Sequence, residues 1–174
     1  MSTFTIVKVG GSLFDHPGLA VALRKWLAMQ PAGDYRLLAG GGPAADVVRR
    51  YHRTHGLSEE FSHWLAIRTM DINGALLREL AGDAAPVVDA FAFCNADEVR
   101  PGALEHTWRV TSDAIAARVA EVLGASELVM LKSIDLPEGI TWHDAADAGL
   151  VDRAFGDVIS RSNLAVRWVN LRSQ

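Results

Sequence analysis

The sequence alternates short strand-like runs with helical segments, and this alternation limits the chain to a small set of folds. In each of three units, a short run typical of a β-strand is joined by a turn to a segment with apolar residues at helical spacing. The paired strands and helices cover residues 4–9 with 17–29, 35–42 with 43–56, and 127–134 with 111–125. Such alternation predicts an α/β fold with a mainly parallel sheet covered on both faces.

The remaining segments continue the pattern. Residues 57–80 predict a long helix capped by Ser58, residues 85–93 predict a strand, residues 144–160 predict partial helix, and residues 164–171 predict a final strand. No internal linker or low-complexity tract interrupts the chain. Its 174 residues, 49% of them hydrophobic, suffice for one sizeable core, so we expect a single domain over residues 1–174.

The charge and cysteine content exclude several classes of partner. The net charge is −4, with 17 basic and 21 acidic side chains scattered along the chain, so we expect neither nucleic acid nor a membrane as partner. Cys94 is the single cysteine, which rules out an internal disulfide framework and suits a reducing compartment. No signal sequence or bilayer-spanning apolar run is present, and we expect a cytoplasmic protein.

Glycine-rich turns follow the first two predicted strands. Residues 10–12 are Gly-Gly-Ser and begin two residues after Lys8, and residues 40–42 are three glycines that precede a helix. Glycines let backbone N–H groups approach an anion, and a helix N-terminus favours negative charge. A tight structural turn would explain either motif alone. Two of them at equivalent points of consecutive units favour sites for the donor and the acceptor of a phosphoryl group.

A dinucleotide site is the main alternative for the second turn. Gly40, Gly42 and Ala45 satisfy the pattern G-x-G-x-x-A, and the acidic pair at 59–60 follows at a distance suited to a ribose contact. Pro43 interrupts the usual turn, and the acidic pair lies at a helix start rather than a strand end. The chain has no G-x-x-x-x-G-K-[ST] motif, so an ordinary P-loop is excluded.

Two further charged residues lie next to apolar segments. Asp113 is in the first turn of a predicted helix, where compensation of the helix dipole explains it without any function. Lys132 ends an otherwise apolar run and so marks the rim of its strand. His63, beside Trp64, either lines a pocket or covers a dimer face. The other histidines lack the partners of a metal site, and we predict none.

The stretches "VKVGGSLF", "LLAGGGPAADVVR" and "TSDAIAARVAEVLGASELVMLKSID", in this order, resemble the amino acid kinase superfamily. The resemblance implies a three-layer α/β/α sandwich, and transfer of the γ-phosphoryl group of ATP, with Mg2+, to a carboxylate, carbamate or phosphate. It also implies site residues: catalytic Lys8 and Asp113, phosphate-binding Gly10, Gly11, Ser12 and Lys132, and acceptor-binding Gly40, Gly41 and Gly42. We further expect Lys8, as a strand-end lysine, to lie outside the core.

The stretches "SHWLAIRTMD" and "HTWRVTSDAIA" and the C-terminal segment are similar to a group of small kinases in C1-carrier (methanofuran-type) cofactor biosynthesis. This similarity adds His63, Trp64 and Arg68 as candidates for the acceptor site. The chain departs from larger superfamily members after residue 132, where "KSIDLPEGITWHDAADAGL" replaces a longer nucleotide lobe and its second phosphate-binding lysine.

These observations predict an ATP-dependent small-molecule kinase whose acceptor is a phosphate or carboxylate, such as an aminomethylfuran phosphate-type intermediate. The alternatives are a noncatalytic ligand-binding or regulatory protein on the same scaffold, suggested by the shortened lobe, and a dinucleotide-binding protein. We also expect a homodimer, because the helix predicted over residues 57–80 has enough apolar surface to pack on a partner.

Overall fold

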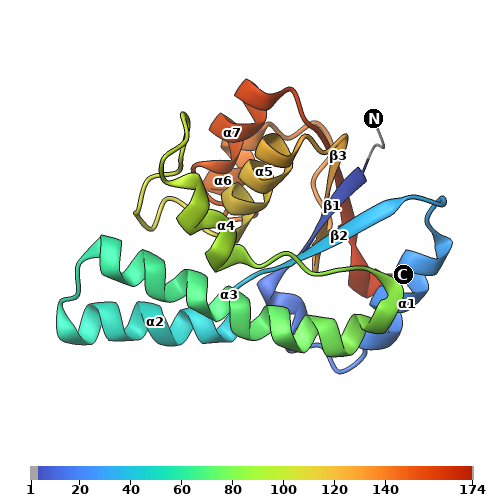
Figure 1. Ribbon diagram of the computed structural model, residues 1–174, viewed down its shortest axis with the longest axis horizontal. Helices are drawn as coiled ribbons and strands as arrows, with labels where there is room; N and C mark the ends of the chain where they lie inside the picture. Colours follow the sequence, from blue (N-terminus) through green and yellow to red (C-terminus); the bar gives the residue numbers. More distant parts are fainter. Residues whose placement is uncertain (1–3, 174) are drawn as a thin grey trace.

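The computed structural model describes residues 4–173 and has a parallel four-stranded sheet at its centre (Figure 1). The strands follow the order β2-β1-β3-β4, and each neighbouring pair is parallel. Their bounds are Phe4–Val9 (β1), Asp34–Ala39 (β2), Glu127–Lys132 (β3) and Ala165–Asn170 (β4). All four carboxyl ends therefore meet at one edge, as the sequence predicts.

Helices cover both faces of the sheet. In Figure 1, α5, α6 and α7 lie on one side, α1 lies on the other, and α2 and α3 run side by side below the sheet. The helices are α1 (Leu19–Met29), α2 (Gly42–His55), α3 (Glu59–Ala81), α4 (Ala90–Asp97), α5 (Ser112–Leu123), α6 (Trp142–Asp147) and α7 (Phe155–Ser162). Short 3₁₀ turns span Gly11–Leu13, Gly82–Ala84 and Leu171–Ser173.

Two apolar cores, one on each face, hold the layers together. Alternate strand residues such as Ile6 and Met130 pack with α4, α5 and α7, whereas Val7 and Leu131 pack with α1. Because side chains alternate between faces, Lys8 and Lys132 share the face of Ile6 and Met130. Both lysines therefore point toward α5.

The predicted helix ends are confirmed by the backbone. The Ser58 hydroxyl accepts a hydrogen bond from the Phe61 N–H at 3.2 Å and caps α3. Gly56 and Gly124 end α2 and α5 with φ of 60° and 72°, a left-handed conformation that glycine adopts without a Cβ penalty.

The strand predicted over residues 85–93 is wrong. Val87 makes only an isolated bridge to Leu37, and Asp89 then accepts a hydrogen bond from Ala92 N–H at 2.8 Å and starts α4. A short apolar run does not distinguish a strand from a buried helix by periodicity, so the capping aspartate decides the outcome here.

None of the helices within residues 4–173 is both long enough and apolar enough to cross a membrane.

Candidate functional site

The two glycine turns touch through their backbones at the carboxyl edge of the sheet. A Cβ atom built on Gly11 would lie 2.5 Å from the Gly42 nitrogen, and one on Gly40 would lie 2.8 Å from the Gly11 nitrogen. The Gly40 N–H donates to the Val9 carbonyl and the Gly10 N–H donates to the Leu131 carbonyl, so both turns continue the ladders of their strands. The absence of side chains is what lets the two turns come this close.

A cavity of about 330 Å³ opens beside these turns. α2 begins at Gly42 and α5 begins at Ser112, and both residues line the cavity. The positive dipole end of α2 faces the cavity, whereas the N-terminus of α5 is already capped by a carboxylate from a later segment. Other lining residues include Gly11, Ser12, Gly41, His63, Trp108 and Thr111. The cavity has the backbone donors and the helix dipole that an anionic ligand needs.

Lys8 and Lys132 both bind Asp113, at the first turn of α5. The Lys8 Nζ donates to Asp113 Oδ1 at 2.6 Å, and the Lys132 Nζ donates to Asp113 Oδ2 at 3.0 Å and to the Leu150 carbonyl at 2.7 Å. The expectation that Lys8 lies outside the core is wrong, since its residue is 2% exposed. Its charge is tolerated there because Asp113 supplies the counter charge.

The environment shifts the pKa of two members of this triad. Burial raises the pKa of Asp113, but the ammonium groups of Lys8 and Lys132 outweigh it, so the net pKa is below the usual range. Burial and the charge of Lys8 lower the pKa of Lys132 to about 8, against the opposing attraction of Asp113. Asp113 is thus a carboxylate at neutral pH, and Lys132 titrates closer to neutrality than a free lysine.

Asp152 is a further site residue that sequence reasoning missed. Its Oδ2 accepts hydrogen bonds from the Thr111 N–H, the Thr111 hydroxyl and the Ala114 N–H at 3.0, 2.8 and 2.9 Å, so it caps α5 from a distant segment. Its Oδ1 is a buried atom with no partner among the described residues. Burial and the nearby Asp113 raise the pKa of Asp152 to about 6. The preceding "GLV" gives no local signal for this role.

The residues predicted for the acceptor site differ in where they lie relative to the cavity. His63 is buried and lines the cavity, and its ring stacks on His106 with a centroid separation of 5.3 Å. Burial and the nearby His106 lower the pKa of His63. Arg68 is exposed, is not among the residues lining the cavity, and lies with its guanidinium 3.2 Å from the centroid of the Phe91 ring. Trp64 packs against Phe91 and His106.

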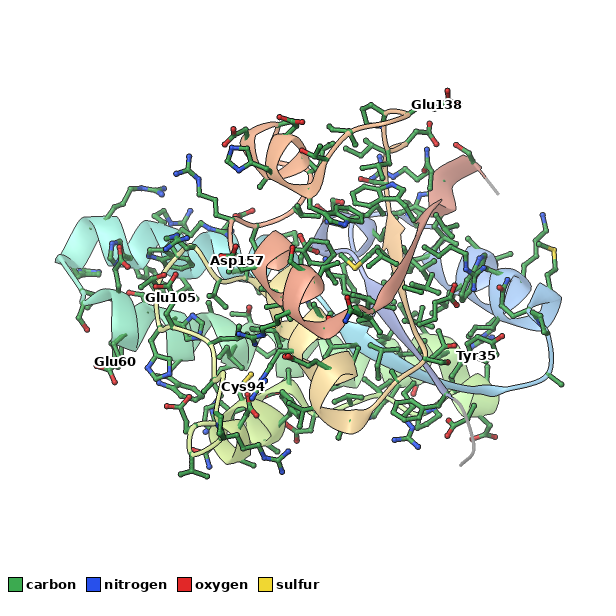
Figure 2. All side chains as sticks on the ribbon, turned by 90° about the horizontal axis from the view of Figure 1, so that it is seen from above. Tyr35, Glu60, Cys94, Glu105, Glu138 and Asp157 are labelled. Atoms are coloured by element: carbon green, nitrogen blue, oxygen red, sulfur yellow. The ribbon has the colours of Figure 1, made fainter. Side chains whose placement is uncertain are left out.

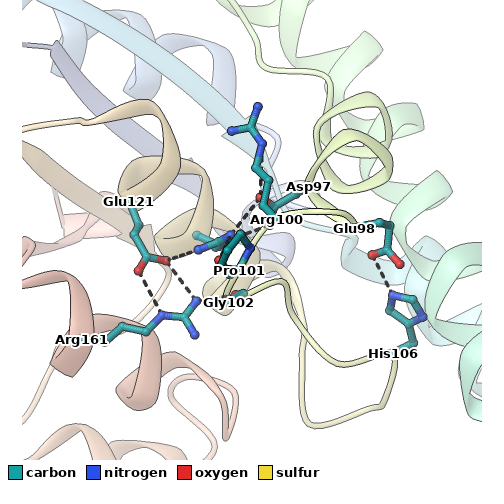
Figure 3. A network of polar contacts seen from close by, with 9 residues as sticks. Asp97, Glu98, Arg100, Pro101, Gly102, His106, Glu121 and Arg161 are labelled. Atoms are coloured by element: carbon teal, nitrogen blue, oxygen red, sulfur yellow. Dashed lines mark hydrogen bonds and ion pairs between the residues drawn. The ribbon is translucent and has the colours of Figure 1, made fainter.

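An ion-pair network fixes the segment between α4 and α5, which carries Trp108 and Thr111 (Figure 3). The buried Arg118 donates to both oxygens of Asp97, at 2.7 and 3.0 Å, and to the Pro101 carbonyl. Glu121 accepts hydrogen bonds from Arg118 and from Arg161. Farther along the segment, Glu105 lies at the same end of the molecule as Glu60 of α3 (Figure 2). One wall of the cavity is therefore anchored to α5 and α7.

Within the part of the chain that the structure describes, no three His, Cys, Asp or Glu side chains come together as a metal site.

Comparison with known proteins gives relatives in sequence and in structure. No protein-family model matches the chain. It is 29% identical over 143 residues to the [5-(aminomethyl)furan-3-yl]methyl phosphate kinase of Methanocaldococcus jannaschii, an alignment that covers 75% of this chain and 66% of the relative. The chain thus spans just under two thirds of that relative's length.

Three solved structures share the fold. The uridylate kinase of Archaeoglobus fulgidus is 18% identical with a TM-score of 0.63, and the alignment covers 97% of this chain and 90% of that one. The UMP kinases of Bacillus anthracis and Ureaplasma parvum give TM-scores of 0.61 and 0.63 at 12% and 14% identity, covering 98% and 99% of this chain and 88% and 91% of theirs. The predicted resemblance is confirmed: the chain has the amino acid kinase fold and is a sequence relative of a [5-(aminomethyl)furan-3-yl]methyl phosphate kinase.

Proposed function

We propose that this chain is a small-molecule kinase that transfers the γ-phosphoryl group of ATP to an acceptor carrying a phosphate or carboxylate. One observation carries the proposal: Asp113 holds two lysines at the carboxyl edge of the sheet, beside a cavity formed by two side-chain-free turns. The relationship to a phosphate kinase supports the same reaction. This site binds and positions anions, which is most of what phosphoryl transfer requires from a protein.

The residues present fit a phosphate chain with Mg2+ bound to it. The two turns touch backbone to backbone, Gly11 and Gly42 both line the cavity, and the N-terminus of α2 begins there, where its N–H groups favour phosphate oxygens. Mg2+ would be held mainly by the phosphates themselves, and it would supply neutralisation of their charge. We assign to Lys8 and the turn at residues 10–12 the contacts to the transferring group, and to residues 40–42 the contacts to the acceptor.

The reaction needs no side-chain base in this site. An acceptor oxygen that is already anionic forms the new bond to the γ-phosphorus while the bond to the bridging β–γ oxygen breaks, and ADP leaves with that electron pair. Lys8 stabilises the negative charge that develops, and Asp113 fixes its direction. Lys132 holds the other oxygen of Asp113 and restrains the carboxylate.

The cavity also fits the kind of acceptor that the relative's name describes, a phosphate ester of an aminomethylfuran. Trp108 provides a flat apolar wall, Asp15 provides a carboxylate for an amine, and the glycine turns provide donors for a phosphate. We propose an acceptor of this class and a role in C1-cofactor biosynthesis. No observation favours the noncatalytic or dinucleotide-binding alternatives.

The test measures release of ADP from MgATP in the presence of [5-(aminomethyl)furan-3-yl]methyl phosphate, with UMP as a second acceptor. We expect acceptor-dependent turnover that Asp113→Asn lowers by about 100- to 1,000-fold, because the lysines lose their shared anchor. Asp83→Asn is the matched control, since Asp83 is exposed in the 3₁₀ turn after α3. Turnover at the wild-type rate in Asp113→Asn, or none with either acceptor in the wild type, would refute the proposal.

We also propose a cytoplasmic homodimer that pairs through α3. Phe61, Ile72 and Leu76 on this helix are 56%, 64% and 43% exposed, and the spacing of about three turns between Phe61 and Ile72 places both on one face of the helix. Light scattering at micromolar concentration should give the mass of a dimer, and Ile72→Glu should shift it toward the monomer. A monomeric wild type under these conditions contradicts the pairing.

A further inference from the structure

Two more cavities adjoin the first and extend it into a groove. The second cavity, of about 550 Å³, shares Arg49, Trp108 and Thr111 with the first. The third, of about 650 Å³, lies beside α6 and α7 and shares Arg109 and Arg153 with the second. A ligand longer than the acceptor can therefore run from the glycine turns past the start of α5 to α6.

The lysines and aspartates next to the second cavity, of which Asp113 and Asp152 line it, have no net positive charge to offer a long anion. Lys8 and Lys132 are balanced at pH 7 by Asp113 and by Asp152, whose pKa of about 6 leaves it mostly ionised. A nucleoside triphosphate remains anionic even with Mg2+ bound. Further cations are needed for its polyphosphate, and the shortened segment after Lys132 replaces the lobe expected to supply a lysine.

Arg109 and Arg153 are brought to the groove by two segments that are hydrogen-bonded together. The Ala154 N–H donates to the Arg109 carbonyl at 3.2 Å, and the Thr111 N–H donates to Asp152 at 3.0 Å. These bonds place the residues that precede α5 beside the residues that precede α7. The two arginines consequently line the same pair of cavities, one from each segment.

Both guanidinium groups are available to a ligand, unlike those of Arg118 and Arg161, which carboxylates hold (Figure 3). Arg153 is exposed, and none of the arginine ion pairs within residues 4–173 involves it. Arg109 pairs with Glu105 at 3.2 Å, but both side chains are about half exposed, and such pairs contribute little. Glu59 is a further acid that lines the second cavity. Arg49 there lies between two partners, since it pairs with Asp46 at 2.7 Å and its guanidinium is 5.2 Å from the centroid of the Trp108 ring.

We infer that Arg109 and Arg153 bind the polyphosphate of a nucleoside triphosphate donor in the second cavity. This inference rests on the proposed function. The two arginines would supply the positive charge that the shortened segment after Lys132 does not. The guanidinium groups of Arg109 and Arg153, which line the same cavity from neighbouring segments, can each form charge-assisted, bidentate hydrogen bonds to phosphate oxygens. The donor would then extend toward α6 while its γ-phosphate reaches the glycine turns.

The test is calorimetry with Mg2+ and a nonhydrolysable ATP analogue on the wild type, Arg109→Ala, Arg153→Ala and the double variant. Each substitution should weaken binding about tenfold or more, and inorganic tripolyphosphate should show the same losses. Arg53→Ala is the matched control, because Arg53 is exposed near the end of α2 and lines none of the three cavities. Its affinity should equal that of the wild type.

Turnover measurements separate this inference from the proposed function. If the wild type transfers phosphate and the double variant keeps the wild-type affinity and KM for ATP, the inference is refuted and the function stands. If binding depends on both arginines but no acceptor is phosphorylated, the inference holds and the function fails. A wild type that binds no nucleotide overturns both.

Discussion

Replacing Gly11 by alanine tests whether the contact between the two glycine turns forms the site. The new Cβ would lie 2.5 Å from the nitrogen and 2.7 Å from the Cα of Gly42, whereas real Cβ contacts stay above 3.0 Å. Both neighbours are backbone atoms, so no side chain can rotate out of the way. The turns must separate by about 0.5 Å or more, which follows from those distances.

This separation should affect activity far more than stability. A displacement of this order between bound groups lowers the rate by about 100-fold, because the donor and the acceptor lose their alignment. Overpacking typically costs about 1–3 kcal/mol of unfolding free energy, less than the total stability of most domains. We therefore expect a folded protein with kcat/KM reduced about 100-fold.

Gly74→Ala is a matched control that adds the same methyl group in α3. Its Cβ would lie 3.7 Å from the nearest atom, Val87 Cγ1, and alanine is a better helix former than glycine. This variant should gain about 0.5–1 kcal/mol in urea denaturation and keep wild-type turnover. Turnover of Gly11→Ala within a factor of about three of the wild type would show that the 100-fold loss expected from misalignment is wrong.

Two further predictions follow from the charged residues. Activity should fall as the pH rises through about 8, where Lys132 loses its proton, and as the pH falls through about 6, where Asp152 gains one and holds α5 less firmly. In profiles of kcat/KM against pH, Lys132→Arg should move the alkaline limb to higher pH, and Asp152→Asn should remove the acid limb. If the two limbs do not change, the assignment of the limbs to Lys132 and Asp152 is refuted. Arg118→Met should lower the unfolding free energy by about 3–5 kcal/mol, because Asp97 stays buried without its partner. Arg161→Met should cost less than about 1 kcal/mol in the same urea titration, and equal losses would contradict the role of burial.

The sheet and its turns were predictable because their signals are local. The first two strands end directly before glycines and the third ends at Lys132, and the capping residues Ser58 and Gly124 mark helix ends by their own chemistry. Residues 85–93 failed because Val87 and Val88 suit a strand, whereas Asp89 starts a helix and only the tertiary structure decides between them.

The sequence allows candidate site positions to be named, but not the contacts between them. Period-two alternation places Lys8 and Lys132 on one sheet face, yet their shared partner is 105 residues from Lys8 in sequence. Asp152 and Arg153 went unnoticed because their importance comes from hydrogen bonds to the segment before α5. Arg68 looked suitable from its neighbours, but its helix position directs it onto Phe91.

The shared anchoring of two lysines by Asp113 has a consequence for proton uptake. The charge of Lys8 contributes to the lowered pKa of Lys132, so an anion bound at Lys8 raises the pKa of its neighbour. Near pH 8, binding therefore draws a proton from solvent, and affinity decreases as the pH rises through this range. Ligand binding and protonation are thus linked through two lysines that share one carboxylate.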